Sequence, residues 1–174
     1  MSTTVETILL YTIAAGFLSI VYGFFTGKNI LNQSAGNTKM QDIASAIQIG
    51  AKAYLARQYK TIAVVGVVVL VIVSVAFSPL VGLGYLVGAA LSGIAGYVGM
   101  LVSVEANVRT AEASRKGLAQ GLSVAFKSGA VTGMLVAGLA LLSIAVYYYF
   151  LLKYNVDERE IVNALVALGF GASL

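Results

Sequence analysis

The chain has 174 residues, of which 59% are hydrophobic, and its charged residues are only 11 Lys or Arg and 7 Asp or Glu. Soluble globular proteins have about a quarter of their residues charged, so soluble, disordered and nucleic-acid-binding classes fit poorly. The sequence has no Cys and no His, which excludes disulfides, thiol and imidazole catalysis and Cys/His zinc sites within it. The net charge of +4 does not indicate a nucleic-acid partner, because the basic residues flank apolar runs as they do in membrane proteins.

Long stretches without any charge dominate the chain. These runs have 21, 44, 25 and 14 residues and cover 7–27, 61–104, 128–152 and 161–174. A bilayer core needs roughly 20 apolar residues per helix, so the run of 44 corresponds to two spans, which Ser78-Pro79 divides. The pattern predicts an all-α transmembrane bundle, a single domain over 1–174 with four full helices and the start of a fifth.

The first predicted helix covers about residues 4–26 and is followed by a loop, 27–38, rich in Asn, Gly, Ser and Lys. The second covers about 39–77, and Asn37 or Thr38 is placed to cap its start. Pro79 enforces the turn that follows.

The third predicted helix covers about 80–114, with Gly117 placed as a C-terminal cap, and the fourth covers about 118–153. The tyrosines 147–149 are expected to form an aromatic belt at the membrane surface. A short acidic segment then leads to a fifth, incomplete helix, 160–174.

Helix lengths carry two further expectations. Helices of 35 to 39 residues measure about 50 to 58 Å, whereas the hydrocarbon core is about 30 Å thick, so the charged halves of the second, third and fourth helices are expected to stand out into the cytoplasm. The last uncharged run, 14 residues or about 21 Å, is too short to cross. We therefore expect the chain to be the front part of a longer protein.

The distribution of basic residues predicts the orientation. Two residues, Lys153 and Arg159, fall on one side of the predicted bundle. Nine fall on the other side: Lys28, Lys39, Lys52, Arg57, Lys60, Arg109, Arg115, Lys116 and Lys127. The positive-inside rule makes the side with nine cytoplasmic and places the N-terminus outside.

Small residues recur every fourth position in three of the predicted helices. These stripes are Ala15, Ser19, Gly23, Gly27; Gly88, Ser92, Gly96; and Gly129, Gly133, Ala137. A Gly-lined pore or a flexing segment is the functional interpretation, but close helix packing in lipid is favoured, since the 19 Gly are spread over every helix.

Charged residues gather in two places. One group, on the second helix, is Asp42, Lys52, Arg57 and Lys60, and the third helix carries two i,i+4 pairs, Glu105 with Arg109 and Glu112 with Lys116. An anion site for a phosphate-bearing substrate is one interpretation; ion pairs between helices and anchors at the lipid headgroups are favoured.

Acidic residues are too scattered for a metal site. Asp42 and Asp157 are the only Asp, and the predicted topology places them on opposite sides of the membrane, whereas Mg²⁺-polyphosphate chemistry needs several carboxylates together. We therefore predict no catalytic, cofactor-binding or metal-binding residue in this chain, which by its residues alone reads as a membrane scaffold.

Several polar segments nevertheless carry a specific resemblance. They are 36–48 (GNTKMQDIASAIQ), 50–61 (GAKAYLARQYKT), 88–100 (GAALSGIAGYVGM), 106–111 (ANVRTA) and 169–174 (GFGASL). Across most of 36–174 the chain resembles the N-terminal part of the membrane-integral pyrophosphatases, pumps that couple pyrophosphate hydrolysis to H⁺ or Na⁺ transport. One departure is Ile49, where that family often has Glu.

The resemblance implies a longer, multi-pass homodimeric enzyme that hydrolyses Mg²⁺-pyrophosphate at the cytoplasmic face and moves H⁺ or Na⁺ outward, with K⁺ as an activator in part of the family. It assigns the first four helices to an outer ring of scaffold helices and the fifth to the inner ring. The family's Asp-rich metal-binding segment falls after the position of Leu174, so no functional residue is carried over and the fragment alone is expected to be inactive. A complete small non-catalytic membrane protein, an assembly factor or subunit, is the alternative.

Overall fold

The computed structural model describes residues 3–174, and within them it is built from five α-helices. They are α1 (Thr3–Leu31), α2 (Thr38–Ala76), α3 (Pro79–Ser114), α4 (Leu118–Lys153) and α5 (Glu158–Ala172). The first four are long and apolar enough to span a membrane. The all-α transmembrane class is therefore confirmed.

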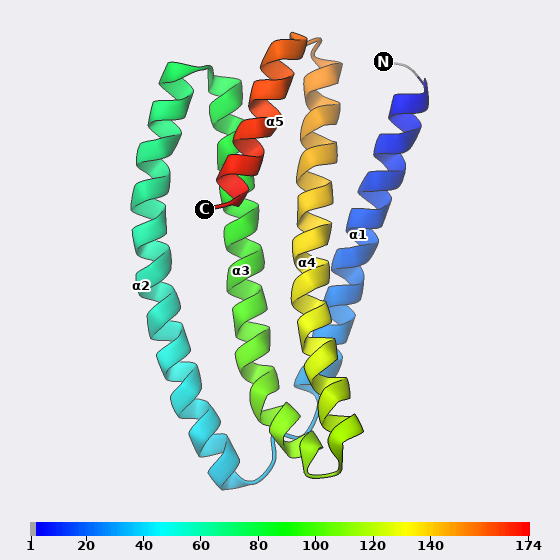
Figure 1. The fold of residues 1–174 in the computed structure, drawn as a ribbon, viewed down its shortest axis with the longest axis vertical. Coiled ribbons are helices and arrows are strands. Elements are labelled where there is room, and N and C mark those ends of the chain that lie inside the picture. The colour runs from blue at the N-terminus through cyan, green and yellow to red at the C-terminus, as the bar shows by residue number, and fades with distance from the viewer. Residues whose placement is uncertain (1–2) are drawn as a thin grey trace.

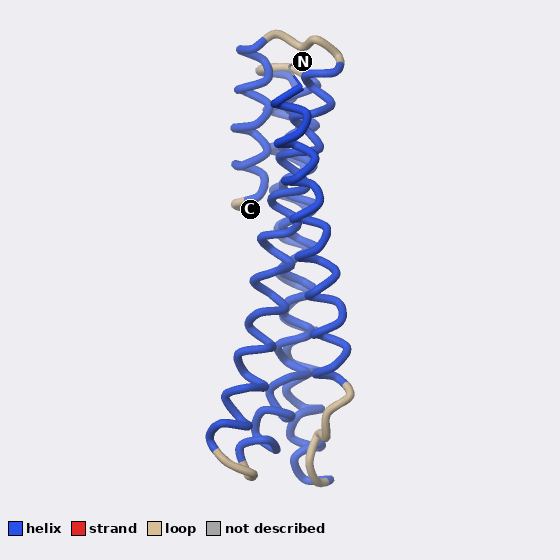
Figure 2. The backbone as a smooth tube through the Cα atoms, turned by 90° about the vertical axis from the view of Figure 1, so that its right-hand side faces the viewer, coloured by secondary structure: helices blue, strands red, loops and turns tan. Residues whose placement is uncertain are grey.

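The four long helices stand side by side in the order α2, α3, α4, α1 (Figure 1). The short α5 packs on α3 from one face of this layer, and the described chain ends about halfway along the long helices (Figures 1 and 2). The α1–α2 and α3–α4 connections lie at one end of the bundle, and the α2–α3 and α4–α5 connections lie at the other (Figure 1).

The helix ends follow the local signals in the sequence. Asn37 caps α2, since its side-chain Oδ1 accepts a hydrogen bond of 3.0 Å from the Met40 backbone N–H. Ser78 caps α3 in the same way, with Pro79 as the first helical residue. Gly117 has φ 143°, which favours glycine, and its N–H bonds to Ser114 O at 3.2 Å. The predicted cap is misplaced, because Arg115 is the C-cap residue of α3 and Gly117 is the N-cap residue of α4.

The first helix is longer than its predicted range of 4–26, and the predicted loop from residue 27 is therefore wrong at its start. The extra turn ends at Leu31 and brings Ile30, whose side chain is fully buried, against Ala106, Val124 and Val131. Tertiary burial outweighs the weak helix propensity of Gly27 and Asn29. At the other end of the chain, α5 begins at Glu158, two residues before the prediction, because Asp157 caps it.

Close packing of α1 on α4 confirms most of the first small-residue stripe. Ser19, Gly23 and Gly27 are buried, but Ala15 is exposed and Gly16 takes its place in the interface. A Cβ on Gly16 would lie 3.0 Å from the Gly138 carbonyl oxygen of α4. The small residues therefore let the two backbones approach.

The predicted packing stripe on α4 is wrong. Gly129, Gly133 and Ala137 are all exposed, and no atom lies within 4 Å of where a Cβ on either glycine would be. The face of α4 that packs instead presents other residues, Ser128, Val131 and Gly138 among them. Fourfold spacing places residues on one face but does not say which face has a partner.

Glycines also set the distance between α3 and α5. Gly84 and Gly88 of α3 and Gly171 of α5 are buried where backbones meet: a Cβ on Gly88 would clash with the Leu168 carbonyl and lie 2.9 Å from the Ala172 nitrogen. The largest apolar cluster adjoins this contact; its buried members are Val81, Tyr85, Tyr147, Leu151, Ile161, Ala164, Ala167 and Leu168.

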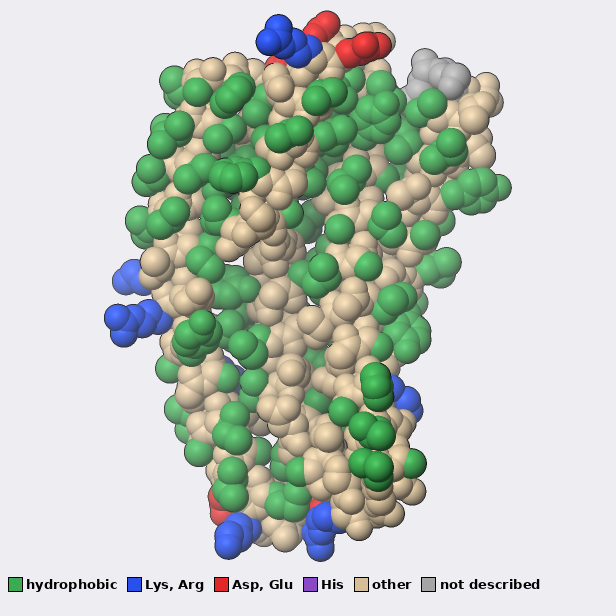
Figure 3. Space-filling view, viewed as in Figure 1, with side chains coloured by type: hydrophobic (Ala, Val, Ile, Leu, Met, Phe, Trp, Pro, Cys, Tyr) green, Lys and Arg blue, Asp and Glu red, His purple; other side chains and the backbone are tan. Residues whose placement is uncertain are grey.

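Apolar side chains also cover the outside of the bundle, as Figure 3 shows over the visible face. The most apolar window of α2 contains no buried residue. A soluble protein would not expose so large an apolar surface, so this surface is the part of an integral membrane protein that meets lipid or further helices.

Candidate functional site

The polar end of the bundle contains the strongest concentration of interacting charges. The α1–α2 loop, the end of α3 and the start of α4 enclose a groove of about 550 Å³. It is lined by Gln33, Ser34, Arg109, Glu112, Ala113, Lys116, Ala119, Gln120, Ser123 and Val124. The groove includes Arg109, Glu112 and Lys116, which belong to the charged group considered above as an anion site.

The guanidinium group of Arg109 makes contacts with α1 and α3 in this groove. Its Nη1 pairs with Glu105 Oε2 at 2.9 Å, which confirms that i,i+4 pair. Its Nε and Nη2 donate hydrogen bonds of 3.2 and 2.9 Å to the carbonyl oxygen of Leu31, the last residue of α1. The Arg109 side chain is only 13% exposed, so it ties α3 to α1 and is not free to receive an anion.

The second predicted pair is wrong in its partner. Glu112 pairs with Arg115, at 3.1 Å, and not with Lys116. Because α3 ends at Ser114, Lys116 no longer follows the helical i+4 geometry. Both ion pairs in the described chain thus lie within or just beyond α3, and neither joins two helices as was favoured from the sequence.

The charges of α2 do not join this groove. Asp42, Lys52, Arg57 and Lys60 are all exposed. The neighbouring Tyr59 contacts α3 at Gly93, sixteen residues or about 24 Å along the helix from Arg109. The two charged groups are therefore separate and do not form one substrate site.

The carboxylates do not fit a magnesium site. Within residues 3–174, no three His, Cys, Asp or Glu side chains are grouped so as to hold a metal ion. Glu105 and Glu112 are each neutralised by an arginine, and Asp157 caps α5 at the opposite end of the molecule from Asp42. No metal ligand is therefore assigned here.

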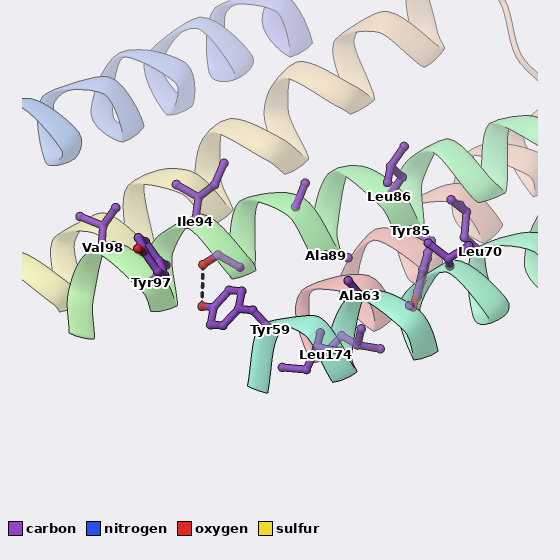
Figure 4. Close-up of a pocket in the computed structure, with 15 residues that line it drawn as sticks. Tyr59, Ala63, Leu70, Tyr85, Leu86, Ala89, Ile94, Tyr97, Val98 and Leu174 are labelled. Atoms are coloured by element: carbon purple, nitrogen blue, oxygen red, sulfur yellow. Dashed lines mark hydrogen bonds between the residues drawn. The ribbon is translucent and has the colours of Figure 1, made fainter. Parts of the chain in front are cut away.

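A second groove, about 640 Å³ and almost entirely apolar, runs between α2 and α3 and reaches Leu174 (Figure 4). The Tyr59 hydroxyl donates a hydrogen bond of 2.7 Å across it to the Gly93 carbonyl. The Tyr85 hydroxyl is buried beside it without a hydrogen-bond partner among the described residues. An unpaired buried hydroxyl is costly, so this groove has the character of an incomplete packing surface.

Besides those of Arg109, three hydrogen bonds between helices were not predicted from the sequence. They join Tyr59 to Gly93, Ser19 to the Met134 carbonyl at 2.7 Å, and Tyr147 to the Leu80 carbonyl. For Ser19 and Tyr147 the available signal was a hydroxyl inside an otherwise apolar run, whereas Tyr59 lies between Gln58 and Lys60 and gave no such signal. Tyr147 is buried in the core, so only Tyr148 and Tyr149 remain for the predicted aromatic belt.

Comparison with known proteins gives the same family as the polar segments. The model of the family described as inorganic H⁺ pyrophosphatase matches residues 17–174. A K⁺-insensitive pyrophosphate-energized proton pump of Methanosarcina mazei is 44% identical over 162 residues, which are 92% of this chain and 23% of that protein. A proton pump of the same description from Caldanaerobacter subterraneus is 38% identical, covering 90% of this chain and 26% of that protein.

A third relative, a putative K⁺-stimulated pyrophosphate-energized sodium pump of Clostridium tetani, is 40% identical over 129 residues, which are 74% of this chain. The chain spans about a quarter of the length, or less, of these relatives. Since the family model covers nearly all of the sequence, the chain belongs to the inorganic H⁺ pyrophosphatase family.

Proposed function

We propose that this chain is the N-terminal portion of a pump that couples the hydrolysis of Mg²⁺-pyrophosphate at the cytoplasmic face to outward transport of H⁺ or Na⁺. The observation that carries the proposal is the match to the inorganic H⁺ pyrophosphatase family over residues 17–174. The relatives named as proton pumps and the relative named as a sodium pump support the reaction class and leave the ion open.

Within such a pump, α1 to α4 act as scaffold helices and α5 begins the inner set. A scaffold role is supported by the contacts of Arg109 with Leu31 and Glu105 and by the apolar composition of the α2–α3 groove. Further helices of the longer protein would fill that groove and supply a partner for Tyr85, and the Mg²⁺ and pyrophosphate ligands would come from those helices. Activation by K⁺ and a homodimeric state belong to the same proposal.

The direct test uses the full-length protein purified from membranes and reconstituted into sealed vesicles. Pyrophosphate hydrolysis that depends on Mg²⁺, together with a pH change or Na⁺ uptake in the vesicles, is the expected result. Adding and omitting K⁺ tests activation, and cross-linking before electrophoresis tests the dimer. Hydrolysis without ion movement, or no hydrolysis, would contradict the pump assignment.

The intact mass of the native polypeptide separates this proposal from the alternative of a small non-catalytic subunit. An antibody against residues 153–160, which include the α4–α5 connection, is suitable because this segment contains exposed polar residues. A band several times heavier than 18.1 kDa is expected. A native band of that small mass would support the alternative instead.

A further inference from the structure

One side of α2 carries a stripe that changes from polar to apolar along the helix. Its members recur at spacings of three and four residues, which places them on one side. They are Tyr54, Arg57, Gln58 and Thr61, followed by Val65, Val68, Ile72 and Val75. We refer to these eight residues as the Arg57 stripe.

The polar half of the Arg57 stripe forms a cleft. Tyr54, Arg57, Gln58 and Thr61, with Ile62 at the edge, line a cavity of about 360 Å³. Among the described residues the Arg57 guanidinium has no ion pair, and the Thr61 hydroxyl bonds back to the Arg57 carbonyl at 3.2 Å. The cleft therefore presents a positive charge and hydrogen-bond donors without an acidic partner.

The apolar half continues directly from this cleft. Val65, Val68, Ile72 and Val75 are 51%, 55%, 59% and 82% exposed, and no charged residue occurs between Thr61 and Val104. The distance from Val65 to Val75 is about 15 Å along the helix, half the thickness of a bilayer core. Basic side chains project at mid-height from the edge of the molecule that α2 occupies, with hydrophobic side chains above and below them (Figure 3).

We propose that the Arg57 stripe binds one anionic phospholipid. The Arg57 guanidinium holds the phosphate, because its paired N–H donors match phosphate oxygens, and the Tyr54 hydroxyl and Gln58 amide add donors. One acyl chain lies along Val65 to Val75. The order of the chemistry along α2, charge first and then apolar surface, is the order that a phospholipid presents from its headgroup into the bilayer.

Charge complementarity selects an anionic lipid over a zwitterionic one. Lys60 lies about one turn further along α2 and adds a second positive charge near Arg57, and it too has no acidic partner in residues 3–174. The nearest acidic residue on α2 is Asp42, fifteen residues or about 22 Å from Arg57. A lipid with a net negative headgroup therefore meets no repulsion here.

Native mass spectrometry of the full-length protein, titrated with phosphatidylglycerol or phosphatidylcholine, tests the assignment. Tighter binding of phosphatidylglycerol is expected, and Arg57→Ala should weaken it about fivefold, the factor for one basic contact with an anionic membrane surface. Arg159→Ala, which removes an exposed basic residue from the first turn of α5 and outside the stripe, should leave it unchanged. Equal binding of both lipids, or an unaffected Arg57→Ala variant, would overturn the proposal.

A second measurement does not require the Arg57 variant to fold. A photo-reactive benzophenone side chain is placed at Val68 and activated in vesicles that contain both lipids. A phosphatidylglycerol adduct is expected, whereas a peptide adduct would show that a protein helix covers the stripe and would overturn the proposal. If excess inorganic phosphate displaced phosphatidylglycerol in the titration, the cleft would be a site for free phosphate, and the lipid proposal would be overturned.

Discussion

Arg109 on α3 donates two hydrogen bonds to the carbonyl oxygen of Leu31, a residue 78 positions earlier that ends α1. The last carbonyls of a helix have no intrahelical partner and carry a partial negative charge. Arg109 satisfies one of these carbonyls and also pairs with Glu105. The Arg109 side chain thus caps the C-terminus of α1 and holds it against α3.

Arg109→Ala is expected to destabilise the protein by about 1–3 kcal/mol, because the Leu31 carbonyl loses both donors and Glu105 loses its partner. Thermal unfolding in detergent measures this loss. Arg115→Ala is the matched control: the Arg115 side chain is 62% exposed in its pair with Glu112, so its removal should cost less than about 1 kcal/mol. Equal losses of stability in the two variants would contradict a stabilising role for the contact between Arg109 and Leu31.

Alanine variants of two arginines distinguish a structural role from a role in binding pyrophosphate. Arg57→Ala and Arg109→Ala should each lower folding or dimer yield more than they change the affinity for Mg²⁺-pyrophosphate. Expression yield and the KM for pyrophosphate of the full-length protein provide the two readouts. Normal yield with a large rise in KM would place the altered arginine in the substrate site.

The α3–α5 contact depends on glycine at position 88. Gly88→Ala would drive a Cβ into the Leu168 carbonyl, so the helices must separate at a cost of about 1–3 kcal/mol. Gly129→Ala is the control, since nothing lies within 4 Å of its Cβ and alanine favours a helix by up to about 1 kcal/mol. Unfolding midpoints of the full-length variants give the comparison, and a neutral Gly88→Ala would disprove the close approach.

The Tyr59 hydroxyl joins α2 to α3. Tyr59→Phe removes its hydrogen bond to the Gly93 carbonyl but keeps the edge-on contact with the Tyr97 ring, whose centroid lies 5.7 Å away. We expect a loss of about 0.5–1.5 kcal/mol, as for other hydrogen bonds between membrane helices. Tyr11→Phe, at a position that is 73% exposed, should be neutral, so a similar effect of both changes would assign the loss to something other than this bond.

Strong local signals account for what the sequence predicted well. The bounds of α2, α3 and α4 agree with their predicted ranges within one residue, because Asn37, Ser78-Pro79 and Gly117 act on the backbone within a few residues of themselves. The end of α1 was placed too early because it depends on burial of Ile30 and on Arg109, which is distant in the sequence.

Pairing between helices was harder to predict for the same reason. The stripe at Gly129 and Gly133 has the same spacing as the stripe at Ser19 and Gly23, yet only the latter meets a neighbour in this chain. At the polar groove, the Glu105–Arg109 pair was predicted from helical spacing. The contact between Arg109 and Leu31 was not, because the two residues are 78 positions apart and meet only through the packing of α1 on α3. The prediction that no catalytic or metal-binding residue lies in this chain still stands as a prediction.

The orientation in the membrane can be tested at the two ends of the bundle. Ser34, in the α1–α2 connection, and Asn155, in the α4–α5 connection, lie at opposite ends. The positive-inside rule places Ser34 in the cytoplasm, since nine basic residues lie towards its side and two towards the other. Ser34→Cys should therefore react with an impermeant maleimide only in inside-out vesicles, and Asn155→Cys only in right-side-out vesicles. Because this chain has no native Cys, such labels report a single position within it, and the reverse pattern would invert the topology and move the proposed hydrolysis site away from the basic end.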